Sequence, residues 1–424
     1  MIDSPAAQSH LLPGLAEPQI HSLANGNSVV SLPLAQAPLV CLDFWCRAGS
    51  VFERAEESGL AHFLEHMVFK GSRRLAAGEF DRRIEALGGS SNAATGFDDV
   101  HFHVLMPPAA AVEALELLLD LVLQPRLEEE AFTMERQVVL EELAQSEDQP
   151  EEVALQELLG LAAPHHPYGL PILGRRQALL AHTPESMAAF HHRQYGGGHC
   201  VLALSGALAG TDLVARAEAG ALAALPRLGD RPLPPALAIS PGRRRLELPR
   251  LEAARLLMVW PLAPAADLDG VMGADLATTL LAEGRRSRLV DRLREQLQIV
   301  ESIDVDLQVL EGGSLVLLEA VCDEDDLPAV QDAITQEWQR LLHDPPGPEE
   351  WQRARRLVSN AYRFGLEAAG GVAGLLGSNL LWGRHHQLDQ PLRQLDAWSP
   401  ERLQADLLPR LDPALAGVLE AVPA

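Results

Sequence analysis

The segment that decides the fold is SGLAHFLEHMVFKG, residues 58–71. Its apolar residues recur at the spacing of one helix face, so the segment predicts an amphipathic α-helix. These apolar residues are Leu60, Phe63, Met67 and Val68. Ser58 is the predicted N-cap and Gly71 the predicted C-terminal stop, because a serine oxygen can accept a free N–H of the first turn and glycine readily ends a helix.

Three polar residues of this helix, His62, Glu65 and His66, are candidates for metal chemistry. At 3.6 residues per turn the two histidines lie one above the other, with Glu65 beside them. Two such imidazoles can bind one zinc ion at about 2.0–2.1 Å, and a catalytic site would need a third protein ligand and an open position. A carboxylate from elsewhere must complete it. From these residues alone, the polar side of an ordinary surface helix is an equal alternative.

Four other histidine pairs are predicted to be structural or solvent-facing. Adjacent helical residues point about 100° apart and do not easily share an ion. His101 and His103 share a strand face, but Asp99 is their only nearby carboxylate in the sequence. The four pairs are His101 with His103, His165 with His166, His191 with His192, and His385 with His386.

The segment 128–152 carries ten acidic side chains against a single arginine, so most of its acids must form a solvated face. Glu135 and Glu142 are seven positions apart and lie close to one line along the predicted helix. One of them could point inward only toward a positive group, because an unpaired buried carboxylate is too costly. A zinc ion would be such a group. The predicted buried side consists of Val138, Val139, Leu140 and Leu143.

Strands and helices alternate on both sides of the first helix. Residues 28–33 and 39–47 are predicted strands, and residues 98–106, DDVHFHVLM, return to strict alternation. The alternating residues Val100, Phe102, Val104 and Met106 are predicted to share one strand face. Two longer helices are predicted over 109–123 and 129–147.

The chain is predicted to divide into two α+β halves. Residues 226–245 are rich in proline and glycine without periodicity, so they are the predicted linker between domains 1–225 and 246–424. The second half repeats the order of the first: a strand, one long helix over 272–297, a strand pair and helices from about residue 327. Because no residue-level repeat accompanies this order, the duplication rests on the pattern of elements.

Composition narrows the classes of function. The chain of 424 residues is 47% hydrophobic with a formal net charge of -25, which predicts a globular protein without nucleic-acid or anionic-membrane partners. Four cysteines without a C-x-x-C pair favour a reducing compartment. The sequence contains neither a signal-peptide pattern nor about 18 consecutive apolar residues, so we expect a soluble cytoplasmic protein.

Several motifs together resemble the pitrilysin/insulinase family of zinc peptidases. HFLEHMVFKGS resembles the inverted motif H-x-x-E-H, and ERQVVLEEL resembles the segment that bears the third ligand, with 76 positions from His66 to Glu142. In layout the chain is similar to short bacterial members and to subunits of mitochondrial processing peptidase. The resemblance continues through GGSSNAATGFDDVHF, HPYGLPILG, HTPESMAAFHHRQY and LLAEGRRSRLVDRLRE.

The resemblance implies a fold and a set of roles. It implies two homologous α+β domains, each a mostly antiparallel sheet with helices packed on one side. It further implies one zinc ion per chain bound by His62, His66 and Glu142, with Glu65 as general base and Glu135 orienting a ligand imidazole. Substrate backbone would be bound by Asn92 and Ala93, on a strand edge to which an extended peptide adds, although from the residues alone Asn92 is equally a turn residue.

One segment departs from the family pattern. Relatives carry an arginine and, seven residues later, a tyrosine that contact the substrate at the scissile bond. In LREQLQIVES the arginine is kept as Arg294, a predicted substrate-binding residue, but the tyrosine position is Glu301. A carboxylate would repel a developing oxyanion. The departure therefore predicts a homologous partner subunit that supplies arginine and tyrosine, with a homodimer as the alternative.

Two functions remain open at this stage. The first is a metalloendopeptidase subunit acting on peptides or unfolded segments inside a two-subunit chamber. The second is a structural or assembly subunit that keeps the fold without turnover. The intact H-x-x-E-H with Glu142 favours the peptidase, because a scaffold alone would not need Glu65.

Overall fold

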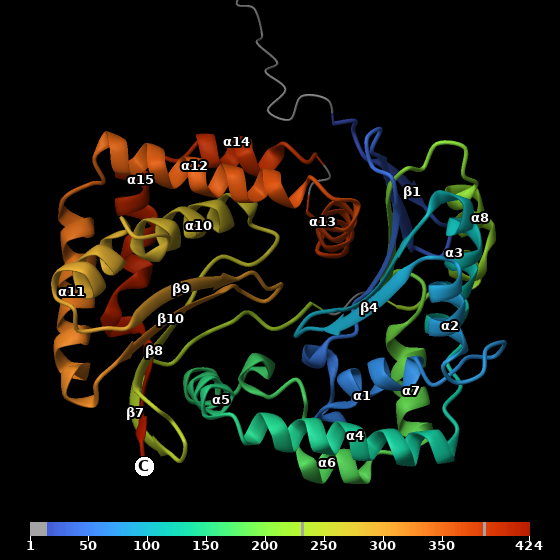
Figure 1. Cartoon of the computed structure of the whole chain (residues 1–424), viewed down its shortest axis with the longest axis horizontal. Helices are drawn as coiled ribbons and strands as arrows, with labels where there is room; N and C mark the ends of the chain where they lie inside the picture. The colour runs from blue at the N-terminus through green and yellow to red at the C-terminus, as the bar shows by residue number, and fades with distance from the viewer. Residues whose placement is uncertain (1–14, 230–232, 385–386) are drawn as a thin grey trace, which may run out of the picture.

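The computed structural model describes residues 15–229, 233–384 and 387–424, and it contains two sheets with helices around them (Figure 1). In the described part of the chain, the first sheet has six strands in the order β1-β2-β6-β3-β5-β4, and its only parallel pair there is β2 with β6. Both strands predicted before the first helix are confirmed. The bounds are β1 Gln19–Ser22, β2 Ser28–Pro33, β3 Val40–Cys46, β4 Ser90–Thr95, β5 Val100–Met106 and β6 Cys200–Gly206.

The helices of the first half follow the predicted order. The two longer helices are confirmed as α3 and α4, and a short 3-10 turn precedes α3. The bounds are α1 Leu60–Val68, α2 Glu79–Ala86, α3 Ala111–Leu123, α4 Glu129–Glu147, α5 Pro150–Ala162, α6 Arg176–Ala181, α7 Pro184–Gln194, α8 Leu213–Ala219 and α9 Ala221–Ala224.

The second sheet has five strands in the order β7-β11-β8-β10-β9, with β7 and β11 parallel and the other pairs antiparallel. This order matches β2-β6-β3-β5-β4 strand for strand, so the predicted two α+β halves and their duplication are confirmed at the level of topology. The bounds are β7 Gly242–Leu248, β8 Ala254–Pro261, β9 Ser302–Gln308, β10 Leu315–Cys322, β11 Gly417–Pro423, α10 Leu268–Ala282, α11 Leu327–His343, α12 Pro348–Gly365, α13 Ala369–Leu381, α14 Gln390–Asp396 and α15 Pro400–Arg402.

Two predicted boundaries in the second half are wrong. The single helix over 272–297 is interrupted: α10 ends at Ala282, Gly284 adopts a φ of +78°, and a separate π-helical turn, η5, covers Val290–Gln296. Glycine reaches this left-handed conformation without steric cost, so it ends the helix there. The last four residues of the predicted linker, 242–245, belong to β7 and pair with β11. The linker also includes residues 230–232, which lie outside the described residues.

Each half contributes one helix to the other half. On β3 the alternate residues Cys41 and Trp45 face α13, whereas their neighbours pack with α1 and α3. On the second sheet, Leu257 and Val259 of β8 pack with α5. Figure 1 shows α5 and α13 between the two sheets. The two sheets are thereby tied together by packing, although the chain passes from one half to the other near residue 240.

Helix α13 approaches the first sheet closely at Gly377. A Cβ placed on Gly377 would lie 2.3 Å from the Trp45 ring, whereas one placed on Gly370, earlier in the same helix, would meet nothing within 4 Å.

Among the described residues, no single helix is long and apolar enough to span a membrane. The helices α12 and α13 are long and apolar enough only when taken together, and a bend of 103° separates them.

The close approach at Gly377 predicts a difference between two glycine substitutions in α13. Gly377→Ala should lower the free energy of unfolding by about 1–3 kcal/mol, because the added methyl overlaps the Trp45 ring. Gly370→Ala is the matched control and should be neutral or stabilising by up to about 1 kcal/mol, because alanine favours the helix. Denaturant unfolding of both variants measures the difference, and equal stability would contradict the packing of α13 on this sheet.

Candidate metal centre

Helix α1 begins at a constrained glycine and is capped by a distant glutamate. Gly59 is the N-cap, with a φ of +82°, and a Cβ there would lie 2.6 Å from the Leu173 carbonyl oxygen. The Glu53 carboxylate accepts the backbone N–H groups of Gly59 at 3.0 Å and Ala61 at 2.8 Å. The predicted cap at Ser58 is therefore wrong by one residue, because the turn needs the left-handed conformation that glycine supplies.

The two histidines of α1 face Glu142 of α4. Their ring centroids lie 4.7 Å apart. Nε2 of His62 is 3.6 Å from one carboxylate oxygen of Glu142, and Nε2 of His66 is 3.4 Å from the other. Ligands about 2.1 Å from a tetrahedral zinc ion are themselves about 3.4 Å apart. The donor set and its spacing therefore fit zinc, and three protein ligands leave the fourth position of a tetrahedral ion for water.

Glu135 of α4, one of the two acidic residues predicted to be able to point inward, is buried behind His66. Its carboxylate lies 2.9 Å from Nδ1 of His66 and 2.7 Å from Nζ of Lys70. Although burial acts in the opposite direction, these two partners lower the pKa of Glu135. A charged Glu135 accepts the Nδ1 proton of His66, which leaves Nε2 free to bind a metal.

The pKa values of the two imidazoles differ because their surroundings differ. Burial, with a smaller contribution from His66, lowers the pKa of His62 to about 4. For His66 burial also favours the neutral form, but Glu135, Glu142 and Glu65 outweigh it and raise the pKa. His62 is therefore in the neutral form that binds metals, whereas the acidic neighbours of His66 favour its protonated form and so compete with metal binding.

Glu65 lies beside the histidines and is held by a neighbouring strand. The Thr95 hydroxyl at the end of β4 donates a hydrogen bond to its carboxylate. Burial raises the pKa of Glu65, although Thr95 and His66 act in the opposite direction. A carboxylate with a raised pKa is a stronger base than an exposed glutamate.

The remaining side of α4 differs in one residue from the prediction. Val139, Leu140 and Leu143 are buried as expected, but Val138 is 48% exposed. Adjacent residues on a helix point about 100° apart. Because Glu135 and Val139 lie on the buried side of α4, the Val138 side chain points away from the core.

Comparison with known proteins decides the family. Residues 28–176 match the family described as "Insulinase (Peptidase family M16)", and residues 181–358 match the "Peptidase M16 inactive domain". The chain belongs to the insulinase family of peptidases. Its relatives carry zinc-protease and processing-peptidase names, which supports the predicted class of protein.

Individual relatives of this insulinase-family chain extend the match. It is 26% identical over 393 residues to an uncharacterized zinc protease of Mycobacterium leprae, covering 91% of this chain and 87% of that protein. It is 32% identical over 209 residues to a probable mitochondrial-processing peptidase subunit beta of Arabidopsis thaliana, covering 49% of this chain and 39% of that one.

Solved structures confirm the fold. A protease from Helicobacter pylori aligns with a TM-score of 0.88 at 22% identity, covering 96% of this chain and 100% of that one. A protein from Pseudomonas fluorescens, described as a peptidase M16 inactive domain, aligns with the same TM-score at 20% identity, covering 96% and 99%.

The predicted substrate-binding residues lie on two separate elements. Asn92 and Ala93 are in β4, the edge strand of the first sheet that also carries Thr95, and the Asn92 side chain accepts the N–H of Ala93 at 3.0 Å. Arg294 lies in η5, where its guanidinium binds the neighbouring Glu295 at 2.8 Å. Glu301 is exposed just before β9. Their roles toward substrate stay predictions.

The other histidine pairs divide into three groups. His166 and His191 are structural, since each ring binds a backbone carbonyl at 2.9 Å, and their neighbours His165 and His192 are exposed. His385 and His386 lie outside the described residues. For His101 and His103 the structure adds a carboxylate that is distant in the sequence, because Asp43 of the adjacent strand lies 3.1 Å from His101.

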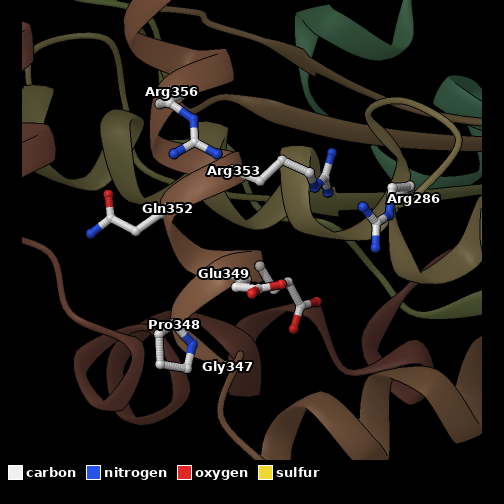
Figure 2. Close-up of a pocket in the computed structure, with 8 residues that line it drawn as sticks. Arg286, Gly347, Pro348, Glu349, Gln352, Arg353 and Arg356 are labelled. Carbon is white, nitrogen blue, oxygen red and sulfur yellow. The ribbon is translucent and has the colours of Figure 1, made fainter.

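A cavity of about 890 Å³ in the insulinase-family chain lies elsewhere, at the start of α12 (Figure 2). Arg286, Arg353 and Arg356 line it together with Glu349. None of the predicted metal ligands lines it. Its arginines repel a cation, and the described residues that line it include neither histidine nor cysteine, so the candidate centre is the cluster on α1 and α4 and not this cavity.

Sequence reasoning missed three supporting residues of the centre: Glu53, Lys70 and Thr95. Lys70 has a recognisable signal, because it follows His66 by four positions and therefore lies near the same helix face. Glu53 and Thr95 have none, since each reaches α1 from another element.

The contact between Glu135 and His66 predicts an effect on metal affinity. Glu135→Ala should weaken zinc binding by roughly ten- to a hundredfold, because the imidazole loses the acceptor that fixes its tautomer and orientation. Glu141→Ala, an exposed position of the same helix, is the control and should leave the affinity unchanged. Competition titration with a zinc chelator measures the zinc affinity of both variants. Equal affinities would show that Glu135 does not orient the His66 ligand.

Proposed function

We propose that this chain is the zinc-binding subunit of a metallopeptidase that hydrolyses peptides or unfolded segments. His62, His66 and Glu142 would hold one zinc ion per chain. The observation that carries the proposal is the approach of both Nε2 atoms, 3.6 and 3.4 Å, to the two carboxylate oxygens of Glu142. The zinc-protease names of the relatives support the choice of metal.

The residues around the ion would then divide the chemistry. When bound, zinc would lower the pKa of a water molecule and stabilise negative charge on the scissile carbonyl oxygen. Glu65 would take a proton from the attacking water and return it to the leaving amine. Thr95 would hold the Glu65 carboxylate in place through its hydroxyl. Glu135 would keep the His66 proton on Nδ1.

Glu65 and His66 should respond differently to substitution. Glu65→Gln should retain zinc but lose peptide hydrolysis by a hundredfold or more, the order expected for a general base. His66→Ala should lose the zinc together with the activity. Elemental analysis and hydrolysis of an unstructured peptide measure the two properties. The exposed Glu56→Gln is the control, and a zinc-loaded Glu65→Gln with full activity would exclude this mechanism.

An extended peptide would bind along β4. This strand is at the edge of the sheet, so one side of its backbone has no partner strand in the sheet order. A peptide added there would be recognised through its backbone, with Asn92 and Ala93 at the middle of the strand, and would run toward Thr95 and Glu65. Arg294 would contact the substrate from the second half.

The proposed assembly is a pair of subunits around a closed chamber. Here the tyrosine position is Glu301, and Arg294 is engaged with Glu295. A homologous partner subunit would supply the missing arginine and tyrosine, and the likeness to a processing-peptidase subunit beta supports this choice. A homodimer with other oxyanion donors is the alternative assembly.

The partner hypothesis predicts that the isolated chain has weak activity. A site without its oxyanion donor loses about 3–4 kcal/mol of transition-state stabilisation, which corresponds to hundreds-fold in rate. Mixing with a homologous subunit that carries arginine and tyrosine should restore this activity, whereas Glu301→Tyr in this chain should change little. Hydrolysis assays of the chain, the partner and their mixture decide the point. Full activity of this chain alone, with no gain on mixing, would refute the hetero-pair.

The competing function is an assembly subunit without turnover. It would keep the fold and the metal ligands but would not need Glu65 as a base. The position of Glu65, near His66 and Glu142 and held by Thr95, favours the peptidase.

A further inference from the structure

A second group of potential metal ligands lies on the first sheet, on the face opposite to the one that packs against α1. Asp43 of β3 is directly opposite His103 of β5, and His101 is two positions along β5, opposite Trp45. Residues two apart on a strand, and residues directly opposite on neighbouring strands, share a face. The three side chains therefore project from one face of two interior strands, where the backbone is fixed by pairing on both sides.

The geometry of the three side chains suits one ion. One ligand atom from each residue lies within 4.8 Å of the others. Nδ1 of His101 is 3.1 Å from an Asp43 carboxylate oxygen, within the range of about 3.0–3.4 Å that separates neighbouring ligands of one transition metal.

Stacking holds the His101 ring in this orientation. The Trp45 ring lies 4.3 Å from it at an interplanar angle of 15°, and the His103 ring lies 5.7 Å away at 18°. A ring that stacks on two flat neighbours presents its nitrogens in a constant direction. Such preorganisation reduces the entropy that a flexible ligand would lose on binding an ion.

Charge and space both favour a cation. Asp43 is only 2% exposed, and a buried carboxylate requires compensation by a positive group. The α13 residue above it is Gly374, whose missing side chain leaves room, since a Cβ there would lie 3.8 Å from the carboxylate. His101 and His103 are only half-buried, so an ion can approach. Asp99 is already bound by the Trp382 indole N–H at 3.1 Å.

We propose that Asp43, His101 and His103 form a second binding site for a divalent transition metal, independent of the centre on α1 and α4. Two imidazoles and one carboxylate are the donors that Zn²⁺ and similar ions prefer, and three ligands leave positions open to water or another group. The site does not depend on the proposed peptidase function.

Metal stoichiometry of single and double variants tests the site. After chelation and dialysis, wild-type protein titrated with Zn²⁺ should bind two ions, and His66→Ala and His103→Gln should bind one each. The double variant His66→Ala/His103→Gln should bind none, whereas the control His66→Ala/His192→Gln, altered at an exposed histidine, should still bind one. Titration with Co²⁺ should show the same pattern in its absorption spectrum.

The alternative is that Asp43 and His101 form an ion pair without a metal. Wild-type protein would then bind one ion, His103→Gln would also bind one, and His66→Ala would bind none, which overturns the proposal. Melting curves of the metal-free variants check folding. If His103→Gln is unfolded, Asp43→Asn replaces it. In the His66→Ala background, Zn²⁺ should raise the melting temperature, and Asp43→Asn should abolish this rise.

Discussion

The candidate centre depends on the packing of α1 against α4. Phe63 and Phe132 meet across this interface with their ring centroids 4.6 Å apart, and both are fully buried. This apolar contact fixes the separation of the two helices, and the polar residues one turn away must then satisfy one another. Glu135 is buried in the same interface and is held by His66 and Lys70. Apolar packing thus sets the distance at which Glu142 meets the two imidazoles.

The second sheet is coupled to this centre through the elements between the halves. Arg47, just after β3, forms a buried ion pair with Glu311 of the turn between β9 and β10. Asp98 accepts the Tyr168 hydroxyl at 2.6 Å and the Glu311 N–H at 2.6 Å, so the same turn is bound twice. Together with α5 and α13, these contacts join the halves into one packed body. The face of β3 that carries Asp43 is covered by α13, a helix from the other half of the chain.

Much of the first half follows from local sequence. The alternation Val100, Phe102, Val104, Met106 specified a strand buried on one face, which the structure confirms. The spacing of Leu60, Phe63 and Met67 specified α1, and the four-residue interval between His62 and His66 put both rings on one side. These features depend on backbone periods of 2 and 3.6 residues, which any sequence displays directly. By contrast, the left-handed Gly59 and the break at Gly284 depend on local sterics that periodicity does not report.

By itself the sequence determined the α+β class, the duplicated order of elements and the two histidines of the H-x-x-E-H motif. It also singled out Glu135 and Glu142 as the acidic residues of α4 that could point inward toward a positive group. Only the tertiary structure decided that both Glu142 oxygens approach the imidazoles, that Glu135 lies behind His66, and that Asp43 joins His101 and His103. It also decided that α5 and α13 pack on the sheets of opposite halves. The reason is physical: periodicity fixes the face of an element on which a side chain lies, whereas the partner of that face is chosen by burial and charge compensation between residues far apart in the chain.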